Sequence, residues 1–143
     1  MEKIKLENFN NEYGFAMPIE KHLSQHDCSV ILLHIYNKFH IHNIEELFSI
    51  LECKSINIDT INAKDDNVNI EEVFSNVDIA VLPNIYINWG DFDNIDCLKY
   101  NTFCNYFDDI WYPAIDDIEI FDETCDWFLS IKHYGLISYW KSK

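Results

Sequence analysis

The chain of 143 residues contains no arginine, only three glycines and only three prolines. Its glycines, Gly14, Gly90 and Gly135, stand far apart, so no glycine-rich phosphate loop or dinucleotide-binding fingerprint can be formed from them. Nucleotide-dependent enzymes that use those loops are therefore excluded by motif.

The chain also lacks an export signal, a membrane-spanning run and a paired set of cysteines. Its first residues have no apolar core followed by a small-residue cleavage site, and the longest apolar run, 30–36, is interrupted by His34. Five cysteines without a Cys-x-x-Cys pair do not form the disulfide framework of a secreted domain. We therefore expect a cytoplasmic protein with reduced thiols and no membrane partner.

No pattern predicts a metal, a cofactor or a catalytic residue. His40 and His42 lack a further ligand at familiar zinc spacing. The run Asp91-x-Asp93-x-x-Asp96 is similar to the start of a calcium loop, but an acid replaces the glycine that such a loop needs. The spacing of histidines and cysteines favours no nucleophile pair.

Negative charge is what the chain has in excess, with 25 acids against ten lysines and a formal net charge of −15. Residues 1–64 hold six lysines and nine acids, whereas residues 65–143 hold four lysines and sixteen acids. Such a charge repels nucleic acids and anionic membranes and accelerates the encounter with a basic protein. Direct binding to DNA or RNA is not expected.

Acids and aromatic rings are concentrated in the same stretch of the second half. Residues 91–128 contain eleven carboxylates and ten aromatic residues against a single cation, Lys99. A cationic partner would neutralise such a surface, while tyrosine and tryptophan rings would supply anchoring contacts. The sequence thus predicts a binding protein. The residues expected to contact the partner are Asp91, Asp93, Asp108, Asp109, Trp111, Tyr112, Asp116, Asp117 and Glu119.

Some of these residues have an equally good structural interpretation. Trp111 fits a role in closing the hydrophobic core as well as it fits a contact. Asp116 and Asp117 fit a solvated turn before a strand. Asp91, Asp93 and the nearby Asp96 fit loop residues that serve only solubility.

Helices are predicted mainly in the first half. Asn43 is a helix cap before 44–51, whose apolar residues recur at helical spacing, and Asn69 precedes a shorter helix at 70–74. The apolar run at 29–39 fits a helix or a strand, and we favour the helix. Aromatic residues in 99–110 are spaced for one face of another helix.

Strands are predicted mainly in the second half, at 85–89, 118–121, 127–133 and 136–140, with a further strand at 56–59. A two-residue turn at Tyr134 and Gly135 would place Ile131 opposite Ser138 and complete a three-stranded meander. The sum is a single α+β domain over residues 1–143, with a mainly antiparallel sheet in the C-terminal half and helices packed on it.

The segments Phe107–Pro113, Asp116–Asp122, Trp127–Ile131 and His133–Gly135 carry a resemblance to a known family. Over roughly residues 84–140 this pattern of acids, aromatics and strand spacing resembles the C-terminal portion of small acidic bacterial immunity proteins, those of contact-dependent inhibition and related polymorphic-toxin systems. The resemblance implies a protein that binds one cognate toxin domain, often a nuclease, and blocks its active site or substrate groove.

The charge pattern agrees with that implication, because carboxylates can take the place of phosphates in the cationic groove of a nuclease. Two other classes stay open: an acidic nucleic-acid mimic or regulatory protein that acts on a basic host factor, and a small enzyme of another family.

Overall fold

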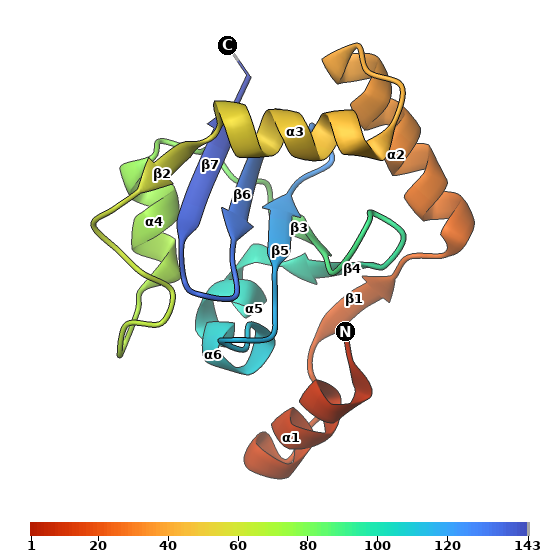
Figure 1. Ribbon diagram of the computed structural model, residues 1–143. Helices are drawn as coiled ribbons and strands as arrows, with labels where there is room; N and C mark the ends of the chain where they lie inside the picture. The colour runs from red at the N-terminus through yellow and green to blue at the C-terminus, as the bar shows by residue number, and fades with distance from the viewer. Residues whose placement is uncertain (143) are drawn as a thin grey trace.

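A computed structural model describes residues 1–142 of the chain (Figure 1). Its seven strands are β1 (Ile19–His22), β2 (Ile56–Ile58), β3 (Asn84–Asn88), β4 (Ile95–Lys99), β5 (Ile118–Phe121), β6 (Trp127–Ile131) and β7 (Ile137–Lys141). They form one antiparallel sheet in the order β1-β4-β3-β5-β6-β7-β2. The predicted α+β class is confirmed, and so is the meander of β5, β6 and β7.

Six helices are described: α1 (Lys3–Tyr13), α2 (Gln25–Phe39), α3 (Ile44–Lys54), α4 (Ile70–Asn76), α5 (Tyr100–Asn105) and α6 (Phe107–Ile110). Two hydrophobic cores lie on opposite faces of the sheet. One packs α1, α4, α5 and α6 against the strands, and the other packs α2 and α3 against them. In Figure 1, α3 crosses the strands of the meander on the near face. Because both faces are covered, every residue of β5 and β6 is buried.

Local sequence signals explain the helices that were predicted. The Asn43 side chain accepts a hydrogen bond from the Glu46 amide at the start of α3, and Asn69 caps α4 in the same way. Acids follow both caps in the first helical turn, where the helix dipole favours negative charge. The ambiguous run at 29–39 is helical, within α2. Among residues 1–142, no helix has the length and apolar character needed to cross a membrane.

One predicted helix is divided. Residues 100–110 form two short helices, α5 and α6, because the backbone leaves helical geometry at Tyr106 (φ −120°, ψ 28°). Lys99, which was predicted to begin the helix, is the last residue of strand β4. Phe103 and Phe107 are still buried against the same core, so the spacing predicted the buried face but not the break.

The hairpin between β6 and β7 differs from prediction by one residue. Ile131 pairs with Ile137, not with Ser138. The turn contains three residues, since the Gly135 amide donates to the Lys132 carbonyl (2.7 Å) and the Lys132 amide donates to the Leu136 carbonyl (2.9 Å). Gly135 has φ +96°. A three-residue hairpin loop commonly ends in a residue with this left-handed backbone conformation. A shift of one residue exchanges the two faces of a strand.

Three elements were not predicted: α1, β1 and β4. Strand β4 contains Asp96, which the sequence placed in a solvent-exposed loop; that interpretation is wrong, because Asp96 is 1% exposed. Asp96 is buried because its carboxylate pairs with the Met1 amine and accepts a hydrogen bond from Trp89, and local sequence does not reveal the distant partner.

Candidate functional site

Many acids of the predicted contact surface have structural partners instead. Of the eleven carboxylates in 91–126, four are buried: Asp96, Asp116, Glu119 and Asp122. Burial of a carboxylate is unfavourable unless hydrogen bonds or a cation compensate it. Asp122, for example, accepts hydrogen bonds from the Trp127 indole (2.9 Å) and the Thr124 amide (3.0 Å) in the β5–β6 turn.

The buried acids also fasten the N-terminal helix to the sheet. The Lys5 ammonium pairs with Asp116, donates to the Ile110 carbonyl (2.7 Å), and lies over the rings of Trp89 and Tyr112 at 4.7 and 4.3 Å. Asp116 also accepts from the Tyr112 amide (2.8 Å). The expectation that Asp116 faces the partner or solvent is therefore wrong, and Tyr112 is occupied as one wall of a lysine-binding cage.

Asp96 likewise holds the first residue of the chain against the sheet. Its carboxylate pairs with the Met1 amine and accepts from the Trp89 indole (2.9 Å), and it lies 2.8 Å from the His22 ring nitrogen Nδ1. The chain itself therefore supplies some of the positive charge that neutralises its acidic stretch.

Trp111 belongs to the core. It is 3% exposed, it stacks on Phe107 with a ring distance of 5.8 Å, and its indole nitrogen donates to the Asp116 carbonyl (3.0 Å). Of the two interpretations left open for this residue, the structural one holds, because a ring in that position cannot insert into a pocket of another protein.

The remaining predicted contact residues are not brought together in one patch. Asp91 and Asp93 are exposed in the β3–β4 loop, where the Asp93 carbonyl accepts from Gln25 of α2 (3.0 Å). Asp109 accepts a hydrogen bond from the Tyr13 hydroxyl (2.8 Å), and this bond raises the pKa of Tyr13 to about 12. Asp108 and Asp117 are also exposed, and Asp117 lies near the β6–β7 turn, where its carboxylate accepts a hydrogen bond from the His133 amide.

We call that region the hairpin end. Backbone hydrogen bonds join the turn to two flanking loops, from the Ala63 amide to the Gly135 carbonyl (2.8 Å) and from the Ala114 amide to the His133 carbonyl (2.7 Å). The three joined segments carry two exposed apolar side chains and, with Asp108 of α6, four exposed acids. The hairpin end comprises Asp65, Asp66, Asp108, Ile115, Asp117 and Tyr134.

The hairpin end contains a groove of about 460 Å³. Three acids, Asp65, Asp66 and Asp108, line it together with one cation, Lys64, and its apolar lining includes Pro113 and Trp111. Asp117 lies at the turn itself: burial would raise its pKa, but hydrogen bonds from the His133 amide (2.7 Å) and ring lower it below the usual value, so it is ionised. A groove lined by both acids and apolar side chains suits the charged head and alkyl stem of a basic side chain.

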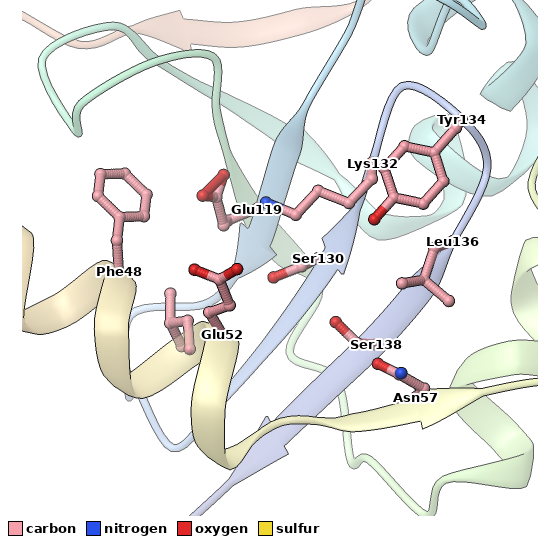
Figure 2. A pocket seen from close by; sticks show the side chains of 10 residues that line it. Phe48, Glu52, Asn57, Glu119, Ser130, Lys132, Tyr134, Leu136 and Ser138 are labelled. Carbon is pink, nitrogen blue, oxygen red and sulfur yellow. The ribbon is translucent and has the colours of Figure 1, made fainter.

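A second concave feature lies on the sheet face that carries α2 and α3 (Figure 2). In-register pairing places a polar residue on each of five neighbouring strands, and the row consists of Asn57, Ser138, Ser130, Glu119 and Asn88. The adjacent row, which includes Phe121 and Phe128, is aromatic and packs in the core under the two helices. We call the space beside the polar row the sheet-face cavity.

The sheet-face cavity has a volume of about 340 Å³ and is walled by α3 and the hairpin. Figure 2 shows Glu52 of α3 and Glu119 of β5 directed into the same space, with the Lys132 side chain reaching toward Glu119. Phe48 and Tyr134 line its two sides.

Glu119 is 7% exposed, and burial raises its pKa to about 7. Lys132 opposes this shift through its charge, and the Asn88 amide opposes it through a long hydrogen bond of 3.4 Å. Glu119 was predicted to contact a partner from the surface. The structure places it at the bottom of a cavity, where only a group that enters the cavity can reach it.

The sequence signal for this cavity was present but unrecognised. Ser130, Ser138 and Asn57 are polar residues whose two chain neighbours are apolar or aromatic. The predicted hairpin register separated Ser130 from Ser138, whereas the observed register pairs them.

Within residues 1–142, no group of three or more His, Cys, Asp and Glu residues is arranged to hold a metal ion. No protein-family model, curated protein or solved structure matches the chain significantly.

Proposed function

We propose that the chain is an immunity protein, which binds a cationic toxin domain, such as a nuclease, through the hairpin end and occludes its active site. The resemblance in the C-terminal half supports the class of protein. The net charge of −15 supports the sign of the partner's charge.

One observation carries the proposed location: the hairpin end combines exposed apolar side chains with a surrounding set of acids. Ile115 and Tyr134 are 66% and 53% exposed. Backbone hydrogen bonds join their loops to each other and to Ala63, which lines the groove together with Asp65, Asp66 and Asp108. Protein interfaces are commonly built in this way, with an aromatic or aliphatic anchor at the centre and polar groups at the rim.

The mechanism we propose is competition with phosphates. A nuclease groove is cationic because it must hold a nucleic acid backbone. Asp66 and Asp108 would contact the lysines and arginines of the toxin's groove, while Tyr134 packs against the toxin and excludes water. Substrate would then be blocked without any chemical step.

Coexpression with the product of the neighbouring reading frame tests the assignment. We expect the chain to restore growth and to form a complex that weakens as salt is added. If growth is not restored and no salt-sensitive complex forms, the immunity assignment fails.

Variants of the chain test the location. Asp66→Lys and Asp108→Lys should slow association, because rim charges act mainly on the encounter rate, and Tyr134→Ala should speed dissociation. Glu20→Lys is the matched control, because it changes the charge equally on β1, at the opposite edge of the sheet. Unchanged kinetics in all three test variants would place the interface elsewhere. Asp93→Lys would then show whether the β3–β4 loop contributes.

A binding role explains the sheet-face cavity better than catalysis does. A serine nucleophile needs a base within hydrogen-bond reach. The residues that line this cavity include no histidine, and Glu119 receives its hydrogen bond from Asn88. We therefore propose a binding protein and not an enzyme.

A further inference from the structure

We propose that the sheet-face cavity binds a cationic organic group, an alkylammonium or a guanidinium, with the carboxylates of Glu119 and Glu52 as its counter-ions. Its source in the cell would be a lysine or arginine side chain of the toxin, and to that extent the inference rests on the proposed function. The chemistry of the cavity can be tested without any partner.

The hydroxyls of two serines in the polar row are available to a ligand. Ser130 and Ser138 are 7% and 8% exposed, and both line the cavity. Among residues 1–142, the side-chain hydrogen bonds of this row engage Asn88 and Glu119 but not the two serine hydroxyls. Both hydroxyls border the cavity, so they are free to donate to or accept from a polar ligand that enters it.

The sign of the charge is the second argument. Two carboxylates, Glu52 and Glu119, and one ammonium, Lys132, line the cavity, so an added cation finds a net negative site. The serine hydroxyls and the Asn57 side chain offer oxygen acceptors to the N–H groups of the ligand. An anion would have to approach the two carboxylates and leave Glu119 without a counter-ion.

The apolar lining indicates the shape of the ligand. Phe48, Leu51 and Leu136 stand with Tyr134 around the polar row, which suits the methylene stem behind a charged head. Binding sites for small molecules commonly have volumes of about 300–1,000 Å³. At about 340 Å³ this cavity is at the lower end, and a group of side-chain size fits it.

The position of the cavity connects it to the proposed interface. The hairpin lines the cavity with Lys132, Tyr134 and Leu136. At the same turn, the Gly135 carbonyl accepts a hydrogen bond from the amide of Ala63, which lines the acidic groove. The hairpin turn therefore lies next to both hollows, and a partner seated over it is close to the cavity.

Binding should depend on pH in a defined direction. The charged groups that act on Glu119 are Lys132, Asp117 and Asp91, and Glu52 and Tyr134 face it across the cavity. With a pKa of about 7, Glu119 is about 10% ionised at pH 6 and about 90% ionised at pH 8. A cation should bind about tenfold more weakly at pH 6, because binding requires the ionised form.

The test is a titration of the isolated protein with ethylguanidinium and with n-butylammonium, followed by NMR shifts of the amides of residues 119, 130 and 138. We expect saturable shifts at millimolar concentration at pH 8. N-ethylurea, the neutral counterpart of ethylguanidinium, should give none. Absence of shifts with both cations, or equal shifts with the urea, would overturn the proposal.

Two variants should change the affinity in opposite directions. Glu119→Gln should abolish binding, and Lys132→Met should strengthen it by removing the competing cation. Glu123→Gln is the matched control, because it makes the same chemical change at an exposed site outside this cavity. If Lys132→Met weakens binding and butyrate binds instead, the cavity is an anion site and the proposal is wrong.

The source of the cation is settled by adding the toxin. Displacement of the bound probe by the toxin would identify a toxin side chain as the occupant. If the probe binds but no toxin complex forms, the cation site stands and the immunity function fails. If the complex forms but no probe binds, the immunity function stands and this inference fails.

Discussion

Lys5 and Asp116, 111 positions apart in the chain, form a buried ion pair that joins helix α1 to the segment before β5. The pair is enclosed by the rings of Trp89 and Tyr112. It shows why a count of acids overstated the available contact surface: some of these carboxylates already have their cation.

Replacement of Lys5 by methionine should destabilise the fold by about 3–5 kcal/mol, because it leaves the Asp116 carboxylate buried without a counter-ion. Urea unfolding measures the change. Lys3→Met is the control, since that side chain is 89% exposed and pairs only with its helical neighbour Glu7. The double variant Lys5→Met, Asp116→Asn should recover part of the loss. A single variant as stable as the parent would contradict the ion pair.

Glu119 should make the protein more stable as the pH falls from 8 to about 5. Its pKa is about 7 in the folded state against 4.5 for an unperturbed glutamate, so between these values the folded state binds a proton that the unfolded chain releases. Stability from this group is complete below the lower value and is lost as the pH rises through 7. The whole change is about 3 kcal/mol at 1.36 kcal/mol for each pKa unit.

Glu119→Gln isolates this contribution from the general repulsion among acids. The free energy of unfolding of the variant should exceed that of the parent at pH 8 and approach it at pH 5. Glu123→Gln should leave the slope unchanged. Parallel curves for Glu119→Gln and the parent would show that Glu119 titrates normally.

Gly135→Ala should cost more stability than Gly14→Ala. Both glycines have positive φ, but a Cβ at residue 135 would lie 1.8 Å from Oδ1 of Asn62, whereas nothing lies within 4 Å of one at residue 14. We expect about 1 kcal/mol for the strain alone at residue 14, and more at residue 135. Thermal unfolding of both variants gives the comparison. Adding Asn62→Ala should reduce the difference, and equal losses would contradict the close approach.

Alanine substitutions at Trp111 and Tyr134 should have different effects, the first on the stability of the fold and the second on binding of the toxin. Trp111→Ala removes a buried ring and should cost about 3–5 kcal/mol of stability. Tyr134→Ala should leave the unfolding midpoint nearly unchanged, because the side chain is half exposed, while the toxin complex dissociates faster. The opposite pattern would restore Trp111 as a contact residue.

Sequence reasoning succeeded where the signal is local. The caps at Asn43 and Asn69 and the alternation in β5 and β6 depend only on residues a few positions apart, and these elements were found. Strand β6 ends at Ile131, two residues before the predicted end. Sequence reasoning failed at Asp96, whose strand is recognisable only once the groups that pair with its carboxylate are known.

The hairpin shows how a small local error hides a site. The turn was assigned two residues instead of three, and that difference moves Ser130 away from Ser138. With the observed pairing the two serines join Glu119 in one row, and the cavity beside that row becomes visible.

The amino-acid sequence by itself determined the α+β class, most of the strands and the strongly negative charge, because each depends on composition or on short-range periodicity. Only the tertiary structure decided which acids are buried, which face outward and which line a cavity. The physical reason is that the cost of burying a carboxylate is set by the groups around it, and for Asp116 the decisive group, Lys5, lies at the other end of the chain.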